Sequence, residues 1–369
     1  MKMICPRCRN QDPQYFYTFN QITYCRKCIG IGTKQVVQLE NRLLNNKVNY
    51  HLNYQLTPLQ KEISDQLLLR YRQHLNTRLK AVCGAGKTEI TYAVIKYALN
   101  QNQHVCFTTP RKELVIELAN RFKSHFTNVD ITCVYGGHSQ KTSGQFIICT
   151  THQLYRYSNC FDLLILDELD AFPYANNDVL KGMLQNSIRG NYIYMSATLT
   201  DDPDLLMTKR YHGHLLDLPK FHRTLTSLSY LISIIKIKQY AKLQKPVIVF
   251  VPSIQLSTKI AQLFKLAGLK SQACSSKTKN IAYYLEQLKN KQLDVVVATT
   301  ILERGITIDN VQVIILQGNN RIYNRDTLIQ ICGRVGRNIH HPSGNIDIFA
   351  PYKTRAIKQC IEVIKHDNA

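Results

Sequence analysis

The sequence has few acidic residues. It holds 25 Asp and Glu against 47 Lys and Arg, which leaves a formal net charge of +22 at pH 7. A surplus this large favours a polyanionic partner, bound through phosphate contacts that release counterions. Charge alone leaves two alternatives open: a basic surface that is merely solvated, and attraction to an anionic membrane surface.

Long apolar runs are also missing. The sequence has no stretch of about 18 apolar residues, which excludes a transmembrane helix of ordinary length. Its first residues, Met1–Pro6, lack the apolar segment of a signal peptide. We therefore expect a cytoplasmic protein.

The twelve cysteines do not indicate a disulfide framework, because disulfides are rare in the cytosol. Four of them have the spacing of a metal site. Most of the others lie in or near apolar runs, so we expect buried, inert thiols. These are Cys83, Cys106, Cys133, Cys149 and Cys160.

From about residue 54, short apolar runs rich in Val and Ile alternate with helical patterns. Such runs are typical of central strands in parallel sheets that helices cover on both faces. An irregular stretch, 217–220, separates two groups of runs. We therefore predict an α/β protein with two tandem parallel-sheet domains, residues 51–222 and 223–369, after a small module over residues 1–50. The expected strands are Val105–Thr109, Phe146–Thr150, Leu163–Leu166, Tyr192–Met195, Val247–Val251, Val295–Ala298 and Val311–Leu316.

Two CxxC pairs, Cys5/Cys8 and Cys25/Cys28, lie in the N-terminal module with sixteen residues between them. This spacing is typical of a zinc ribbon or knuckle, and a region this short needs the metal to fold. A redox role would need a thioredoxin-like βαβ pattern, which is absent. The aromatic residues between the pairs have two open interpretations: they contact single-stranded nucleic acid, or they form the module's small core.

The segment Ala81–Thr88 has the form of a phosphate-binding loop between a strand and a helix. Its small residues let backbone N–H groups approach phosphates, which Lys87 would also reach, and the Thr88 hydroxyl would ligate Mg²⁺. The first position is Ala81 where the usual pattern has Gly. The loop residues proper are Cys83, Gly84, Ala85 and Gly86.

Two further segments complete a predicted ATP-hydrolysing site. An apolar strand ends in acids, where Asp167 would hold Mg²⁺ and Glu168 would polarise the attacking water. Downstream, Arg334 and Arg337 are three residues apart, which would place both on one helical face. Arginines from a second domain can stabilise charge on the γ-phosphate when the domains close. A solvated basic helix end is the alternative.

In this order, the segments resemble the motifs of superfamily-two helicases and translocases, and the match runs from residue 54 onward. The resemblance implies that both domains are RecA-like. It also implies that Gln60 reads the adenine, that Gly305 belongs to the nucleotide site, and that three residues couple the nucleotide to domain movement. The coupling residues are Ser196, Thr198 and Gln330.

The same resemblance implies contacts with nucleic-acid phosphates that ignore base sequence. His152 has an alternative role as a residue that caps a helix. Backbone amides at Gly136 and Gly137 would add to these contacts. The remaining contact residues are Pro110, Arg111, Thr151, Thr299 and Thr300.

Within the superfamily the sequence resembles the ComFA family of competence ATPases. The four-cysteine module ahead of the motor, the stretch Ala81–Glu89 and the acidic box followed by Ala171–Pro173 carry this resemblance. It implies an ATP-dependent translocase of single-stranded DNA that acts in DNA uptake, at the inner face of the cell membrane. It also implies two partners, the phosphoribosyltransferase-like protein ComFC and the membrane DNA channel. Leu169 and Cys332 depart from the usual residues, and neither should touch phosphate.

Three other functions compete with this interpretation. A PriA-like replication-restart helicase also combines cysteines with such a motor, but its cysteines lie between motor segments. An RNA helicase would carry the DEAD form of the acidic box. A zinc-dependent DNA-binding adaptor with an inactive ATPase would have lost polar catalytic positions, and all of them are intact here.

Overall fold

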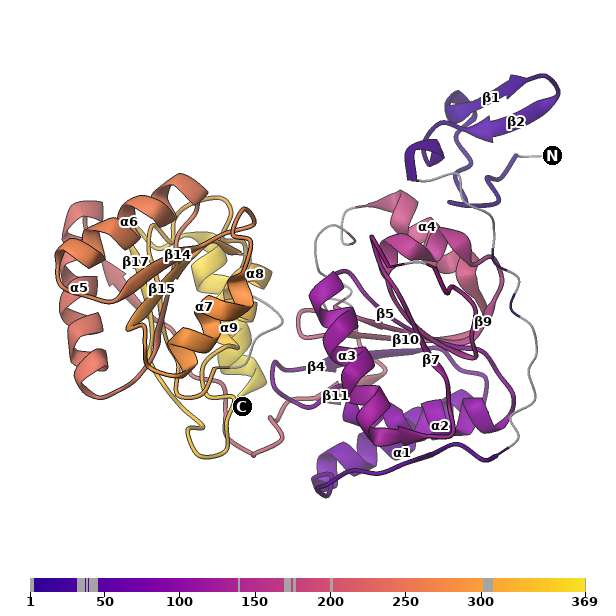
Figure 1. The fold of residues 1–369 in the computed structure, drawn as a ribbon, viewed down its shortest axis with the longest axis horizontal. Coiled ribbons are helices and arrows are strands. Elements are labelled where there is room, and N and C mark those ends of the chain that lie inside the picture. Colours follow the sequence, from indigo (N-terminus) through magenta and orange to yellow (C-terminus); the bar gives the residue numbers. More distant parts are fainter. Residues whose placement is uncertain are drawn as a thin grey trace. The chain divides into compact units, whose positions relative to one another are not determined.

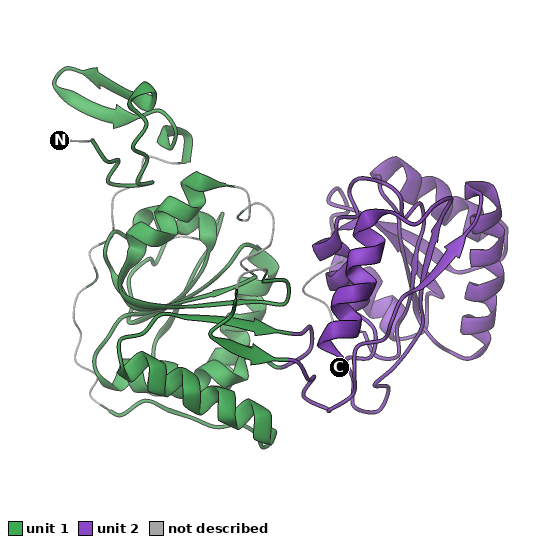
Figure 2. Cartoon of the chain, turned by 180° about the vertical axis from the view of Figure 1, so that it is seen from behind, with its two compact units in different colours: residues 1–81, 86–207 green, residues 82–85, 208–369 purple. Residues whose placement is uncertain are grey.

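The computed structural model describes residues 3–31, 37, 39, 46–138, 140–168, 174, 177–199, 202–300 and 308–368. The chain forms two compact units (Figure 2). Unit 1 comprises residues 1–81 and 86–207; unit 2 comprises residues 82–85 and 208–369. The predicted domain boundary after His222 therefore differs from the division into units, which falls after Met207.

Unit 1 is built on a parallel sheet that has seven strands within the described residues, in the order β11-β4-β10-β9-β5-β8-β7 (Figure 1). Strands β5 and β8 are buried along their whole length because helices cover both faces. In chain order the strands are β4 (Thr77–Ala81), β5 (Val105–Thr109), β7 (Ile131–Val134), β8 (Phe146–Thr150), β9 (Phe161–Asp167), β10 (Ile188–Ser196) and β11 (Leu205–Met207).

The two faces of this sheet differ in their packing. On one face Tyr92, Phe107, Phe122 and Phe146 pack ring against ring, with neighbouring ring centroids 5.0 to 5.5 Å apart. On the other face the strands pack against α4 and η4. The helices are α1 (Pro58–Arg72), η3 (Glu89–Thr91), α2 (Tyr92–Asn100), α3 (Lys112–His125), η4 (Thr151–Arg156) and α4 (Asp178–Ser187); a short antiparallel pair joins β3 (Asn49–Tyr50) to β6 (Phe126–Thr127).

Unit 2 carries a second parallel sheet, with six strands in the described residues and the order β12-β17-β16-β13-β15-β14. Helices α7, α8 and α9 cover one face, and α5 and α6 cover the other. The elements are β12 (Lys220–Arg223), α5 (Thr226–Lys242), β13 (Val247–Phe250), α6 (Ile254–Leu266), β14 (Ser271–Cys274), α7 (Ile281–Lys289), β15 (Val295–Ala298), β16 (Gln312–Ile315), α8 (Arg325–Cys332), β17 (Ile346–Ala350) and α9 (Arg355–Asp367).

The four-cysteine module (residues 3–31) holds a β-hairpin and packs on α4. A Cβ atom at Gly182 would overlap the carbonyl oxygen of Cys8, so helix and module approach as closely as only glycine allows. Asn186 Nδ2 donates to the carbonyl oxygen of Pro6 at 2.6 Å. The module's elements are η1 (Pro13–Tyr15), β1 (Phe16–Phe19), β2 (Ile22–Cys25) and η2 (Ile29–Ile31).

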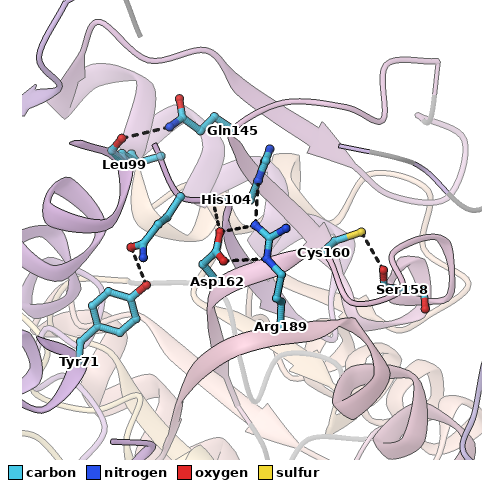
Figure 3. A network of polar contacts seen from close by, with 9 residues as sticks. Tyr71, Leu99, His104, Gln145, Ser158, Cys160, Asp162 and Arg189 are labelled. Atoms are coloured by element: carbon cyan, nitrogen blue, oxygen red, sulfur yellow. Dashed lines mark hydrogen bonds and ion pairs between the residues drawn. The ribbon is translucent and has the colours of Figure 1, made fainter. Parts of the chain in front are cut away.

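A network of polar contacts joins strand starts at the amino-terminal edge of the first sheet (Figure 3). Asp162 at the start of β9 accepts two hydrogen bonds from Arg189 at the start of β10, at 2.8 and 2.6 Å. The same carboxylate accepts the backbone N–H of His104, which precedes β5. A bidentate pair of this kind holds three strand starts together, away from the edge where the predicted site residues lie.

The predicted α/β architecture is confirmed, and three of the seven expected strands have the predicted bounds, namely β5, β8 and β15. The irregular stretch predicted over residues 217–220 ends one residue earlier, because Lys220 begins the edge strand β12. The expected thiols are buried except Cys133, which is half-buried, and all twelve cysteines lie in described parts of the chain and are free. None of the described helices combines the length and apolarity that crossing a membrane requires.

We predict that unit 2 depends on one buried carboxylate. Asp347 on β17 is fully buried and meets Lys236 Nζ at 3.0 Å and His222 Nε2 at 2.6 Å. The substitution Lys236→Met should lower the free energy of unfolding by about 1–3 kcal/mol, because it removes a charged partner from a buried carboxylate. Urea unfolding measures this, with the exposed Lys238→Met on the same helix as control. Equal denaturation midpoints for the two variants would contradict the prediction.

Candidate nucleotide and nucleic-acid site

The predicted nucleotide residues lie at the carboxyl ends of three neighbouring strands of unit 1. Strand β10 lies between β4 and β9, in the register that pairs Met195 with Asp167 and Ser196 with Lys80. Because the strands are parallel, the loop after β4, the acids at the end of β9 and the hydroxyl residues after β10 meet at the carboxyl edge. Ligands bind at this edge in open α/β sheets.

The glycine-rich loop needs glycine at two positions. Gly84 and Gly86 have φ angles of +84° and +79°, which residues with a Cβ rarely adopt. A Cβ at Gly86 would also overlap Nε2 of Gln60. Gln60 is buried and forms a capping box with Thr57 at the start of α1. The structure therefore brings the predicted adenine-reading residue against the predicted phosphate loop.

Lys87 and Asp167 form an ion pair across this edge. Lys87 Nζ lies 3.5 Å from Asp167 Oδ1, and the two side chains are only 15% and 16% exposed. Burial raises the pKa of Asp167, although the Lys87 ammonium opposes the shift. Thr88 is buried beside Lys87. An ammonium, a hydroxyl and a desolvated carboxylate are a donor set that suits a nucleotide phosphate with Mg²⁺.

The residues after β9 and β10 are held by local hydrogen bonds. Thr198 N donates to Ser196 Oγ at 3.0 Å, and both hydroxyl side chains are buried. Glu168 has a φ of +65°, and its N–H donates to the Asp167 carboxylate at 3.0 Å. A non-glycine residue with this φ indicates that the turn, and not the residue's own preference, sets the direction of the side chain.

The residues predicted to contact nucleic acid follow β5 and β8, the next two strands along the same edge. Arg111 is half-buried and His152 is exposed, whereas Pro110 and Thr151 are buried. Partial desolvation lowers the pKa of His152, although its side chain is still exposed. Arg111 and His152 are thus the side chains of this group that a ligand can reach.

Gly136 and Gly137 lie in a tight turn after the edge strand β7. The backbones of Tyr135 and His138 exchange hydrogen bonds at 3.1 and 2.9 Å, and Gly137 has a φ of +84°. Both glycines are exposed, and a Cβ at either position would meet nothing within 4 Å.

In unit 2 the predicted residues lie after β15 and at the end of α8. Thr299 and Thr300 are half-buried directly after β15. Gln330 is buried on α8, and its Oε1 accepts from Cys83 Sγ at 3.4 Å, in the loop segment that belongs to this unit. The predicted Gly305 lies outside the described residues, as do Leu169 and Ala171–Pro173.

The expectation that Arg334 and Arg337 share a helical face is wrong. Helix α8 ends at Cys332 with Gly333 as its cap, and Gly336 has a φ of +67°, so the chain leaves the helix before either arginine. Arg334 is buried, and Arg337 Nε donates to the carbonyl oxygen of Gly333 at 2.7 Å. The two guanidinium groups are presented by a turn.

Arg210 was not predicted as a site residue. It is 2% exposed, and it donates to the carbonyl oxygens of Cys83 and Gly336 at 3.2 and 2.6 Å. Its Nη2 has no hydrogen-bond partner among the described residues. Burial lowers the pKa of Arg210. One guanidinium thus joins the tip of the glycine-rich loop to the arginine turn. No motif marks this residue, which lies in an irregular segment three positions after β11.

The four cysteines of the module converge into one buried cluster. Their Sγ atoms all lie within 4.8 Å of one another. The Cys5–Cys28 and Cys8–Cys25 distances are 3.7 and 3.8 Å, and four thiolates about 2.3 Å from one zinc ion would be about 3.8 Å apart. Burial raises the pKa of the Cys8 thiol to about 11, so a bound cation would be needed to hold it as a thiolate. The donor set fits tetrahedral zinc.

Two family models match the chain. Residues 53–201 match the res subunit of type III restriction enzymes, and residues 226–339 match the conserved C-terminal helicase domain. The competence protein ComFA of Bacillus subtilis is 32% identical over 99% of this chain and 85% of its own length. ComFA of Streptococcus pneumoniae is 30% identical over the whole chain and 90% of its own length.

Solved helicase structures share the fold. Yeast Dbp5 bound to RNA has a TM-score of 0.62 at 14% identity, over 85% of this chain and 91% of its own. Helicase Lhr of Mycobacterium smegmatis, bound to ssDNA and AMP-PNP, has a TM-score of 0.60 at 15% identity. The alignment covers 85% of this chain and 50% of the Lhr chain. At these identities the likeness concerns the fold, two RecA-like domains.

The fold, the helicase family models and the relatives define a superfamily-two ATPase of the helicase class. Its helicase domains imply the use of a nucleotide with Mg²⁺. Within that class, the chain belongs to the ComFA family of competence proteins.

We predict that Gly86→Ala weakens nucleotide binding at least about tenfold, because the new Cβ would displace Gln60 from the loop. Titration with a fluorescent ATP analogue measures this. Gly213→Ala is the matched control, since Gly213 has a similar φ of +78° but open space around it. Equal affinities of the two variants would show that the Gln60 contact is irrelevant to the nucleotide.

The cysteine cluster predicts that purified protein holds about one zinc ion per chain. The double substitution Cys5→Ser and Cys8→Ser should reduce this to near zero by elemental analysis, because two thiolates do not form a closed structural site. Cys360→Ser, which removes a buried thiol outside the cluster, should leave the content unchanged. Retention of the zinc in the double variant would mean that the ligands are misassigned.

Proposed function

We propose that this protein is an ATP-driven translocase of single-stranded DNA that draws transforming DNA into the cell during competence. The observation that carries the proposal is the shared carboxyl edge of one sheet. There the Lys87–Asp167 ion pair after β4 and β9 neighbours the exposed His152 and the accessible Arg111 after β8 and β5. Membership of the ComFA family and the net charge of +22 support the same partner.

The residues of unit 1 would divide the chemistry of hydrolysis. Lys87 would hold the β- and γ-phosphates, and Thr88 with Asp167 would hold Mg²⁺. Glu168 would orient the attacking water, and Gln60 would read the adenine beside the loop. Magnesium would neutralise charge on the phosphates and would favour the ionised form of the buried Asp167 carboxylate.

Unit 2 would supply the positive charge that completes the site. Arg334 and Arg337 would reach the γ-phosphate when the two units close on ATP, so hydrolysis would depend on domain closure. Gly305 would contribute to the same nucleotide site. Ser196, Thr198 and Gln330 would transmit the state of the nucleotide to the interface between the domains.

DNA would be held through its backbone, which leaves the motor indifferent to sequence. Arg111, His152 and the amides of Gly136 and Gly137 would hold phosphates on unit 1, and Thr299 and Thr300 on unit 2. Lhr, which shares the fold, was solved with ssDNA. Alternating grip between two units would turn cycles of closure into net movement.

The proposal includes the setting that the ComFA family implies. The protein would act at the inner face of the cell membrane, in contact with the DNA channel and with ComFC. The zinc ion would be structural, holding the module against α4.

The test is ATP hydrolysis with single-stranded DNA, duplex DNA and RNA. We expect stimulation by single-stranded DNA above the other two polymers, and loss of turnover by at least about a hundredfold in Lys87→Ala, because the γ-phosphate loses its charged partner. Lys61→Ala, an exposed lysine on α1, is the matched control and should behave as wild type. Displacement of streptavidin from a biotinylated strand measures movement itself.

The outcomes separate the competing functions. Equal stimulation by RNA would contradict a role in DNA uptake. Binding without turnover on any polymer would favour an adaptor with an inactive ATPase. Turnover without streptavidin displacement would contradict translocation while leaving the ATPase in place.

A further inference from the structure

The exposed face of the module's hairpin cannot be its core. In the β1–β2 register Tyr17 pairs with Tyr24 and Phe19 with Ile22, so these four side chains share one face. Tyr17, Phe19 and Ile22 are 42%, 61% and 69% exposed. Phe16 points to the opposite face and packs on the buried cysteine cluster. The structure thus decides against the interpretation that all these aromatic residues build a small core.

Cations accompany the exposed rings. The Arg26 guanidinium lies 4.5 Å from the centre of the Tyr17 ring, and Lys27 Nζ lies 5.3 Å from that of Tyr15. Rings paired with cations are the combination that proteins use to bind single strands, because every base has a face that can stack and every nucleotide carries a phosphate.

A cavity opens between the module and α4. Its volume is about 290 Å³, and Arg9 and Lys27 of the module and Lys181 of α4 line it, against one acid, Asp178. Three basic side chains and one carboxylate leave an excess of two positive charges in the lining. This excess is complementary to a phosphodiester, whereas an apolar peptide would gain nothing from it.

The surface is continuous with the predicted nucleic-acid contacts of unit 1. Arg7 of the module lies 5.4 Å from the ring centre of Tyr155, on the same 3₁₀-helix η4 that carries His152. At about 2 Å per residue, His152 and Tyr155 are about 6 Å apart along the helix axis. The close contacts at Gly182 and Asn186 fix the module on this side of unit 1.

We propose that the four-cysteine module carries a second binding surface for single-stranded nucleic acid, which extends the path over η4. Bases stack on Tyr17 and Phe19, and a backbone phosphate enters the cavity between Lys27 and Lys181. The inference rests on the proposed single-stranded DNA substrate and adds a binding surface that the motor motifs do not include.

Two variants test the two halves of this surface by fluorescence anisotropy. The tip variant combines Tyr17→Thr with Phe19→Thr, and the cavity variant combines Lys27→Gln with Lys181→Gln. The probes are a thirty-nucleotide oligothymidylate and an abasic strand of equal length. The matched controls are Tyr352→Thr for an exposed ring, and Lys61→Gln with Lys238→Gln for two exposed lysines. Unchanged zinc content and thermal unfolding establish that each variant is folded.

We expect the tip variant to bind oligothymidylate at least about fivefold more weakly and the abasic strand with unchanged affinity, because stacking needs bases. The cavity variant should lower the slope of log affinity against log salt by about 0.7 on both strands, since one lost phosphate contact removes about 0.7. Both variants should keep the basal ATPase rate.

The surface is disproved if both variants bind both strands as their controls do. If only the tip variant binds as its control does, bases do not stack on Tyr17 and Phe19. If only the cavity variant binds as its control does, no phosphate binds between Lys27 and Lys181. Failure of the wild type to bind any single strand overturns the proposed function as well, which distinguishes the two results.

Discussion

The parallel pairing of β4, β10 and β9 is the constraint on which the rest of unit 1 depends. Three segments far apart in the sequence, around Lys87, Asp167 and Ser196, become neighbours only because their strands run in the same direction and end together. At the opposite, amino-terminal edge the Asp162–Arg189 pair joins the starts of β9 and β10. On the other side of β9 the parallel order continues with β5 and then β8, which brings the predicted nucleic-acid contacts to the same edge as the predicted nucleotide residues.

Close backbone contacts form a second theme of the structure. The Gln60 side chain lies against Gly86, the Cys83 side chain lies against Gly333, and the backbone of the four-cysteine module lies against Gly182. At each position a Cβ would overlap another atom, so the chain approaches another segment where a larger residue would hold them apart. These contacts join the loop to helix α1, the loop tip to the arginine turn, and the module to α4.

Much of the fold follows from the sequence because strands buried on both faces are continuous apolar runs. Val105–Thr109 and Phe146–Thr150 have the predicted bounds for this reason. The strand β10 begins earlier than expected, at Ile188, because its first residues Arg189 and Gly190 are polar or small and no hydrophobic pattern marks them. The arginine turn was mistaken for a helix because spacing alone does not reveal that Gly333 ends α8.

The site was predictable where a motif marks it and hidden where a contact depends on the tertiary fold. Lys87 and Asp167 are eighty positions apart, and their motifs nevertheless predict a shared site. Arg210 belongs to no motif. It donates to the carbonyl oxygens of Cys83 and Gly336, which lie near it only in the folded chain. The docking of the module on Gly182 is equally invisible in the sequence, since nothing in a single helical glycine shows what it touches.

The central claim is that nucleotide and single-stranded DNA bind at one connected edge. The effect of each ligand on the protein's affinity for the other tests this claim most directly. The measurement is the affinity for oligothymidylate with and without a non-hydrolysable ATP analogue, together with the affinity for the analogue with and without the strand. Coupled sites must change each other's affinity by the same factor, and we predict a factor of at least about five. Affinities that are independent of the other ligand in both directions would contradict the account.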